Sequence, residues 1–198
     1  MAKSTTKSGS VYCLRIALDD VTPTIWRQVW VESRVSLLNL HHTIQAAMGW
    51  TDSHLHMFRI GGVQYATPHP DDDPEYPVVD ERRVLLQKVL DGLSSFSYEY
   101  DFGDGWQHTI TIEERIPQPE HWRGCAFVAA GEQACPPEDS GGAYGYQDFL
   151  DHFGKTRRSK AVREFLQWAG EDFDPHRYDR HAANASLLRM AWNRWGGP

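Results

Sequence analysis

The stretch that decides the fold is YEYDFGDGWQHTITIE, residues 98–113. Aromatic and apolar residues alternate with polar ones on both sides of a short acidic, glycine-rich segment. A period of two is typical of a strand with one buried face. The central segment, residues 101–105, contains two glycines that can adopt the positive φ a tight turn requires. The pattern therefore predicts a β-hairpin with the aromatic side chains of both strands on one face.

Other segments have the alternation or apolar content of strands. Together with the hairpin, the expected strands cover residues 11–18, 25–31, 55–60, 63–66, 96–101 and 106–113. Residues 19–23 and the pair Gly61-Gly62 are turn signals between neighbouring segments. Because strands joined by short turns pair antiparallel, we expect a mainly antiparallel sheet.

One helix has both end signals. Ser36 is a suitable N-cap, the apolar residues that follow recur at helical spacing to Met48, and Gly49 is a suitable stop. Weaker patterns predict helices over residues 81–90, 146–153, 158–169 and 185–195, the last with Asn184 as its N-cap. The fold class expected is α+β: a single domain over residues 11–198, helical in its C-terminal part, behind a disordered tail at residues 1–10.

Composition bounds the class of protein. The chain has 198 residues, 40% of them hydrophobic and 24% charged, which is typical of a globular domain. The polar opening lacks the apolar run of a signal peptide, and no segment reaches the roughly 18 apolar residues of a membrane span. Three cysteines without a CxxC pair predict reduced thiols. We therefore expect a cytoplasmic protein without a membrane partner.

Charge is unevenly distributed along the chain. Residues 1–154 carry 11 basic and 22 acidic side chains, whereas residues 155–198 carry nine basic and five acidic ones. A net charge of −7 argues against general affinity for nucleic acid. A basic run in the C-terminal part is the one candidate for contacts to phosphates. It consists of Lys155, Arg157, Arg158, Lys160 and Arg163.

Two long segments have no sustained period. Residues 67–80 contain four prolines and the run Asp71 to Asp73, so we expect a solvated loop. Residues 117–142 are expected to be irregular, and long irregular segments in compact domains are often functional. Cys125 and Cys135 lie in the second segment and can supply two thiolates to a zinc ion.

Histidines and carboxylates gather around the predicted hairpin. Imidazole and carboxylate are ligands for divalent metals, and the candidate ligands are His54, His56, Asp101, Asp104 and His108. On a strand, His54 and His56 point to the same face, which suits joint ligation. The structural alternatives are that the aspartates stabilise the turn through their own backbone and that His108 is a satisfied core histidine. A neighbouring aspartate can also raise the pKa of His108.

The segment 136-PPEDSGG-142 begins with two prolines, which restrict the backbone, and ends with two glycines, which leave it flexible. Two acidic residues lie between them. The segment suits a loop that presents Glu138 and Asp139, or acids that stabilise the start of the next helix. We expect it to lie beside the 101–108 turn. The candidate binding residues are then Asp101, Asp104, Trp106, Glu138, Asp139 and Tyr146, and the candidate proton-transfer residues are His108 and Glu138.

Five motifs occur in a characteristic order: IWRQVWV, LHHTIQAAMGW, DSHLHMF, YEYDFGDGWQH and ACPPEDSGGAYGY. In this order the chain resembles the plasmid pRiA ORF-three-like family, whose members are often labelled insertion-element passengers or TnpR-like. The resemblance implies an α+β protein of bacteria or archaea. It also implies that some relatives have a cysteine where Ser140 stands in this chain, so this chain would lack a third zinc thiolate. The resemblance implies no reaction, and no serine-recombinase pattern is present.

Three kinds of function fit these observations. The favoured one is a non-enzymatic interaction or accessory module associated with plasmids or mobile elements, with a protein partner. The second is a metal-dependent hydrolase or nuclease-like enzyme that uses the acids and histidines with a divalent metal. The third is a DNA-binding accessory protein that uses the basic run.

Overall fold

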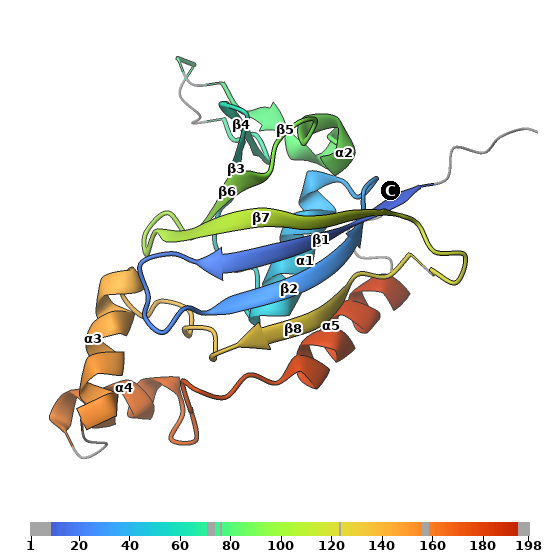
Figure 1. The fold of residues 1–198 in the computed structure, drawn as a ribbon. Helices are drawn as coiled ribbons and strands as arrows, with labels where there is room; N and C mark the ends of the chain where they lie inside the picture. The colour runs from blue at the N-terminus through green and yellow to red at the C-terminus, as the bar shows by residue number, and fades with distance from the viewer. Residues whose placement is uncertain (1–8, 71–73, 76, 123, 156–158, 194–198) are drawn as a thin grey trace, which may run out of the picture.

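The computed structural model describes residues 9–70, 74–75, 77–122, 124–155 and 159–193. Most of the expected N-terminal tail, Asp71 to Asp73, and Arg157 and Arg158 lie outside the described residues. The described chain is a single α+β unit, as the sequence predicts. It is built on one eight-stranded sheet with the order β5-β4-β3-β6-β7-β1-β2-β8 (Figure 1). All neighbouring strands pair antiparallel except β4 and β5, which pair parallel.

The strands are β1 (Ser10–Leu18), β2 (Trp26–Glu32), β3 (His56–Ile60), β4 (Val63–Ala66), β5 (Val79–Asp80), β6 (Ser95–Tyr100), β7 (Trp106–Pro117) and β8 (Phe127–Glu132). The helices are α1 (Leu37–Met48), a 3-10 turn η1 (Glu81–Arg83), α2 (Leu86–Val89), α3 (Gly142–Lys155), α4 (Lys160–Ala169) and α5 (Arg180–Trp192).

The central hairpin is confirmed. β6 and β7 pair in the register Tyr98↔His108 and Tyr100↔Trp106, and all four of these side chains are buried. The turn between the strands closes through the Gly105 amide, which donates to the carbonyl of Asp101 at 2.6 Å. The alternation read from the sequence therefore marks the core face of the sheet.

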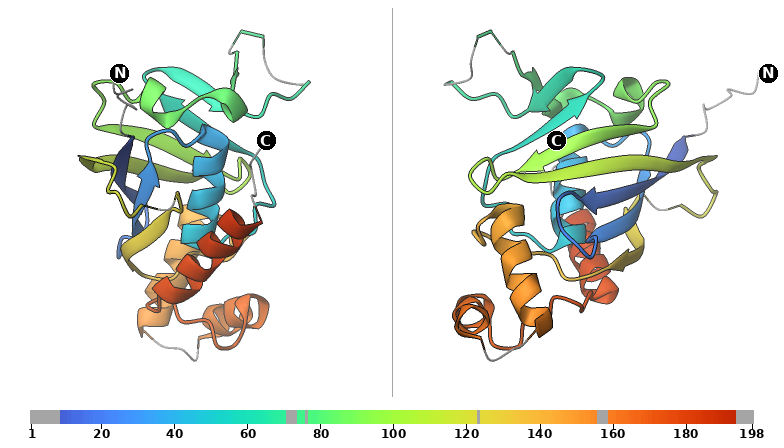
Figure 2. Two further views of the ribbon diagram at one scale, coloured as in Figure 1. Left: turned by 90° about the vertical axis from the view of Figure 1, so that its right-hand side faces the viewer. Right: turned by 60° about the vertical axis from the view of Figure 1, so that its left-hand side comes forward.

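Helix α1 covers the core face and has the caps that its sequence predicts. The Ser36 hydroxyl accepts a hydrogen bond from the Asn39 amide at 3.2 Å, and Gly49 ends the helix with a φ of 111°. Leu37, Leu40 and Ile44 are fully buried in the core that α1 forms with the sheet. Helix α5 lies beside α1 and the edge strand β8, whereas α3 and α4 pack on each other at one end of the sheet (Figures 1 and 2).

Two of the predicted helices are wrong in detail. Residues 81–90 form η1 and α2, because Leu85 is extended and makes a β-bridge with Ser36 that interrupts the helix. Helix α5 begins at Arg180 and is capped by Asp179, which accepts from the amides of His181 and Ala182. Asn184 is therefore inside the helix rather than its cap, and its side chain bonds the backbone of Val128 in β8.

The prediction that residues 117–142 are irregular is also wrong in part. β8 occupies Phe127–Glu132 and pairs with β2 from Trp26↔Glu132 to Trp30↔Phe127. Buried and exposed side chains do not alternate regularly along β8. The period of two that predicts a strand with one buried face is therefore missing here. Within the part of the chain that the structure describes, no helix is both long and apolar enough to cross a membrane.

Candidate metal centre

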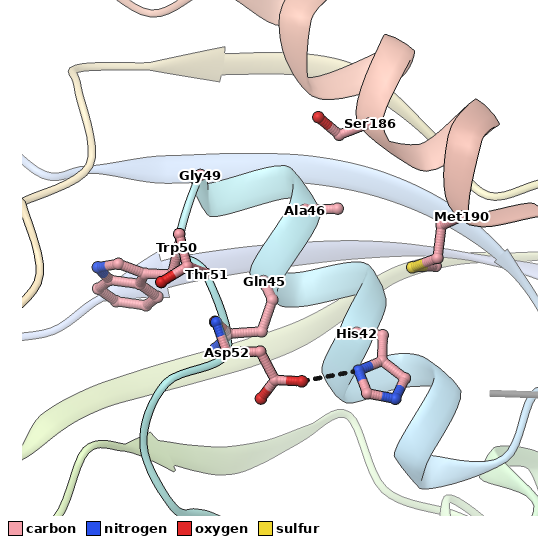
Figure 3. Close-up of a pocket in the computed structure, with 9 residues that line it drawn as sticks. All are labelled: His42, Gln45, Ala46, Gly49, Trp50, Thr51, Asp52, Ser186 and Met190. Carbon is pink, nitrogen blue, oxygen red and sulfur yellow. Dashed lines mark hydrogen bonds and ion pairs between the residues drawn. The ribbon is translucent and has the colours of Figure 1, made fainter. Parts of the chain in front are cut away.

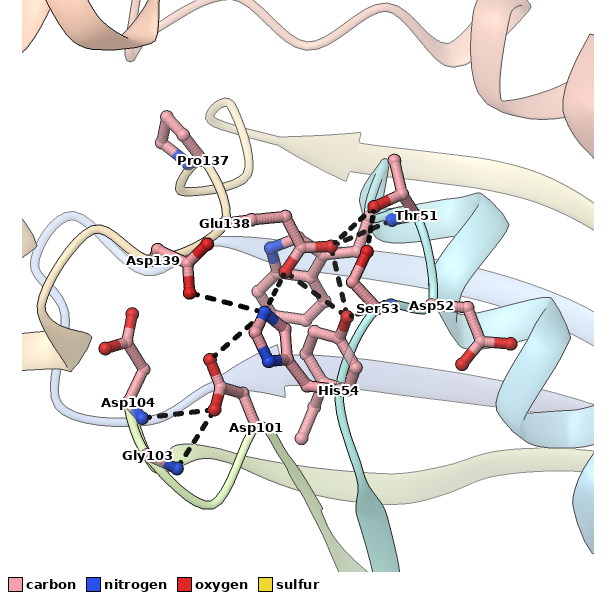
Figure 4. A network of polar contacts seen from close by, with 12 residues as sticks. Thr51, Asp52, Ser53, His54, Asp101, Gly103, Asp104, Pro137, Glu138 and Asp139 are labelled. Carbon is pink, nitrogen blue, oxygen red and sulfur yellow. Dashed lines mark hydrogen bonds and ion pairs between the residues drawn. The ribbon is translucent and has the colours of Figure 1, made fainter.

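Three segments that are distant in sequence meet at one end of the sheet (Figure 4). They are the β6–β7 turn, the segment that follows α1, and the loop that precedes α3. The Gly141 amide donates to Oδ2 of Asp104 at 3.1 Å. A Cβ at Gly142, which has a φ of 68°, would collide with the Asp104 carbonyl oxygen. The close approach confirms that the 136–142 loop lies beside the turn.

His54 is at the centre of this junction. Its Nε2 atom lies 3.7 Å from Oδ2 of Asp101, 3.7 Å from Oε2 of Glu138 and 3.4 Å from Oδ1 of Asp139. The same atom is buried and has no hydrogen-bond partner. These separations are too long for good N–H···O hydrogen bonds. They are close to the distance between two ligand atoms of a tetrahedral zinc site, which is about 3.3–3.6 Å.

Asp101 serves the turn with one oxygen and faces His54 with the other. Oδ1 accepts from the amides of Gly103 at 2.9 Å and Asp104 at 3.3 Å. Oδ2 is the atom nearest to His54. Asp101 is only 5% exposed, and its φ of 57° lies in the left-handed region. Asp139 has a similar φ of 53°. Both carboxylates are therefore held by backbone conformations that non-glycine residues seldom adopt.

Glu138 is held in place by neighbours of His54. It accepts from the Thr51 amide at 2.9 Å, from the Thr51 hydroxyl at 3.1 Å and from the Tyr100 hydroxyl at 3.0 Å. Burial raises the pKa of Tyr100, and the negative charge of Glu138 raises it further. The Tyr100 hydroxyl therefore stays protonated and remains a donor to Glu138.

The ligand atoms of His54, Asp101 and Asp139 all lie within 4.8 Å of one another. One imidazole and two carboxylates are a donor set for zinc or manganese. Among the described residues, no lysine or arginine forms an ion pair with these carboxylates. A cation is thus the natural complement of the cluster.

The structure separates the other predicted ligands from this cluster. Strand β3 begins at His56, so His54 precedes the strand and the alternation that would place both rings together does not apply. The Nε2 atom of His56 lies 2.9 Å from Oε2 of buried Glu81, and its ring stacks on His41 with centroids 3.4 Å apart. Asp104 lies at the rim, where it holds Gly141.

His108 is a core residue. Its side chain is fully buried, and its Nδ1 atom lies 3.1 Å from the Trp106 carbonyl oxygen. Burial lowers the pKa of His108 to about 4, so the raised pKa expected from a neighbouring aspartate is wrong. Trp106 and Tyr146 are also fully buried in the hydrophobic core. All three side chains therefore belong to the interior of the fold.

A second histidine group was not anticipated from the sequence. His41 and His42 on α1 contact the two oxygens of Asp52 at 2.7 and 3.2 Å. His42 and Asp52 line a pocket of about 220 Å³ between α1 and α5 (Figure 3). Hydrogen bonds from His41 and His42 lower the pKa of Asp52, and burial lowers the pKa of His41 to about 4. The short contacts satisfy this group internally, unlike the cluster at His54. The sequence signal that could have predicted this group is the pair of adjacent histidines, His41 and His42, on a predicted helix.

The predicted zinc thiolates are not supported by their surroundings. Burial raises the pKa of Cys135, which favours the neutral thiol. Neither Cys125 nor Cys135 joins a group of three metal-binding side chains in the described ranges.

In the basic run predicted for phosphate contacts, Lys160 lies 3.5 Å from Glu164. Contacts of this run to phosphate stay a prediction.

Comparisons with known proteins give a consistent relationship. A family model described as plasmid pRiA4b ORF-3-like protein matches residues 10–182. The uncharacterised protein y4hQ of Sinorhizobium fredii is 42% identical over 187 residues, which cover 92% of this chain and 91% of that protein. A crystal structure of MM3350, a protein of unknown function from Methanosarcina mazei Go1, superposes with a TM-score of 0.77 at 32% identity. It covers 88% of this chain and 98% of that one.

Proposed function

The chain belongs to the family of plasmid pRiA4b ORF-3-like proteins, and from its geometry we propose that it binds a divalent metal through His54, Asp101 and Asp139. The named relatives are described as uncharacterised or of unknown function, so support comes from the site itself. The observation that carries the proposal is the buried Nε2 atom of His54, which lacks a hydrogen bond and faces three carboxylates.

The geometry and the charges of the neighbouring carboxylates suit a bound divalent ion at this position. A protonated imidazole would bring one positive charge to three carboxylates, and its Nε2–H would lie beyond good hydrogen-bonding distance of each. A divalent ion brings two charges and can bond the Asp101 and Asp139 oxygens directly. Because Asp101 is almost fully buried, its negative charge needs such compensation more than an exposed carboxylate would.

Metal binding is tested by thermal unfolding of protein that was stripped with chelator and purified without a nickel column. Zinc or manganese should raise the melting temperature, because a ligand that binds only the native state stabilises it by about 2.7 kcal/mol at 100 times Kd. Asp101→Asn and His54→Ala should remove this gain. His181→Ala, which changes an exposed histidine outside the cluster, should retain it.

The proposal fails if neither ion shifts the transition of metal-free protein. Elemental analysis of protein purified without added metal provides a second measurement, and it should find close to one equivalent in the parent chain and in His181→Ala. The two ligand variants should contain substantially less.

A second candidate function, docking of a protein partner, rests on helix α5. Leu188 is 60% exposed and Trp192 is 89% exposed. The two residues are four positions apart and therefore lie on the same face of the helix. Large apolar side chains exposed together favour a protein interface. We propose that this face contacts a protein partner, and a second copy of the chain is the first partner to test.

A further inference from the structure

The two carboxylate oxygens of Glu138 have different neighbours. Its Oε1 atom accepts from the Thr51 amide at 2.9 Å and from the Thr51 hydroxyl at 3.1 Å. Its Oε2 atom lies 3.7 Å from Nε2 of His54, the same distance as Oδ2 of Asp101. A carboxylate oxygen has two lone pairs. Because Thr51 binds only Oε1, the oxygen that faces His54 retains lone pairs for an ion.

The Tyr100 hydroxyl fixes the orientation of this carboxylate. It lies 3.0 Å from Oε1 and 3.2 Å from Oε2 of Glu138, and its own oxygen accepts from the Ser53 amide at 3.0 Å. Because the amide occupies the hydroxyl oxygen, the hydroxyl proton is directed to the carboxylate. Tyr100 is fully buried, so its position is set by the core. Carboxylates that bind metals are commonly oriented by such hydrogen bonds.

The three ligands already identified leave one position of a tetrahedral ion to be filled. The ligand atoms of His54, Asp101 and Asp139 lie within 4.8 Å of one another, whereas structural zinc sites have four protein ligands. Glu138 is outside that group of three, so its Oε2 atom has to move towards the ion. The terminal torsion of a glutamate side chain has a broad minimum, so a small rotation costs little. The fourth position can therefore be filled from within the chain.

We propose that Oε2 of Glu138 is the fourth protein ligand, that Tyr100 is its positioning residue, and that the loaded site is closed. This inference rests on the proposed metal site. Glu138 and Asp139 come from the loop that precedes α3, whereas His54 and Asp101 come from the segment after α1 and from the β6–β7 turn (Figure 4). The ion therefore fastens the loop to the end of the sheet. Closed sites of this kind are structural.

The test uses the full chain loaded with cobalt(II), whose visible absorption reports the number and kind of its ligands. The parent chain should show the intense bands of a four-coordinate ion, and added imidazole should not change them. In Glu138→Gln, the amide oxygen keeps the bonds from Thr51, and the amide nitrogen, which is not a ligand, faces the ion. A water should then take the fourth position. The bands of this variant should weaken and should respond to imidazole.

Affinity for cobalt, measured by competition with a chelator, tests the positioning residue. Tyr100→Phe should weaken binding by about 10–100-fold, because it removes the bond that orients the ligand. The matched control is Tyr146→Phe. Tyr146 is also fully buried, and its hydroxyl has no hydrogen-bond partner in the described part of the chain, so its loss should leave the affinity unchanged. Circular dichroism of the metal-free variants checks that each one folds.

A second control separates ligation from charge. Asp104→Asn removes one negative charge at the rim of the cluster but keeps an oxygen for the Gly141 amide. It should weaken cobalt binding less than Glu138→Gln does, and its bands should keep the intensity of the parent chain. Cobalt should also slow amide hydrogen exchange in residues 136–142 of the parent chain, because the ion fastens this loop.

Parent bands that respond to imidazole would show an open position and overturn the inference. An unchanged spectrum and affinity in Glu138→Gln would do the same, as would equal losses in Tyr100→Phe and Tyr146→Phe or unchanged exchange in the loop. In each of these cases the parent chain still binds cobalt, so the proposed metal site stands. A parent chain that binds no cobalt is a distinct result, which removes the metal site and the closed coordination together.

Discussion

Two histidines show how surroundings decide the chemistry of a residue. His54 lies outside the sheet, and its buried Nε2 atom faces three carboxylates. His108 lies on the core face of β7 beside the Trp50 and Tyr98 rings, and it pairs with no carboxylate in the described part of the chain. The first is suited to a cation, whereas the second is suited to remain neutral. Both were candidate ligands from sequence, because residue type alone does not distinguish these environments.

The neutral state of His108 predicts a loss of stability in acid. Its pKa is about 4 in the folded protein and about 6.5 when unfolded, so protonation favours the unfolded chain. The contribution is fully present above about pH 6.5 and decreases as the pH falls towards 4. The slope for one such histidine is roughly 1.4 kcal/mol per pH unit between these values. We expect His108→Gln to reduce the pH dependence measured by urea unfolding.

The measurement is made with chelator present, so that loss of metal in acid does not contribute. His41 has a pKa lowered in the same direction, so part of the pH dependence should remain in His108→Gln. An unchanged slope between pH 4 and 6.5 would contradict the assignment of His108 as a neutral core residue.

At the scale of elements, local signals predicted α1 well and failed where tertiary contacts compete. The cap at Ser36 and the stop at Gly49 depend only on the helix and on the residues next to it in the sequence. The helix predicted over residues 81–90 is divided because Leu86 and Leu37 donate backbone bonds across to Val35 and Val84. Likewise, β8 is a strand because it completes the edge at β2. No local pattern specifies such pairings.

The cap of α1 has a measurable consequence. Ser36→Ala removes the acceptor for the Asn39 amide and should destabilise the protein by about 1 kcal/mol. Because α1 packs in the core, this loss should appear in global unfolding by urea. Ser159→Ala removes the equivalent cap of α4, which packs mainly on α3, and serves as the comparison. A larger global loss for Ser159→Ala would show that α4 contributes more to the cooperative fold than α1.

At the scale of the whole molecule, the two ends of the chain differ in character. The sheet and its loops carry most of the acidic residues, whereas residues 155–198 carry a net charge of +4. The exposed pair Leu188 and Trp192 lies in that basic part, on α5. Metal binding and docking are therefore proposed for separate surfaces and can be tested independently.

Docking through α5 predicts self-association that depends on protein concentration. Sedimentation velocity from about 1 to 200 µM should show a dimer that becomes more abundant with concentration. Leu188→Gln/Trp192→Gln should remain monomeric, because it replaces the apolar contacts of that face. The control is Trp168→Ser, which changes an exposed aromatic residue of α4 outside the α5 face, and it should self-associate as the parent chain does. A parent chain that stays monomeric throughout would exclude a second copy as the partner.

The sequence by itself determined the β6–β7 hairpin, helix α1 and the α+β class, because alternation, caps and turns are local properties of the chain. It also marked His54 and Asp101 as candidate metal ligands and Asp139 as a candidate binding residue. Only the tertiary structure decided that these three meet while His56 and His108 are elsewhere. The physical reason is that the site joins segments tens of residues apart. Their convergence depends on strand order, on the left-handed backbone at Asp101 and Asp139, and on the close approach at Gly142, none of which is encoded in a local pattern.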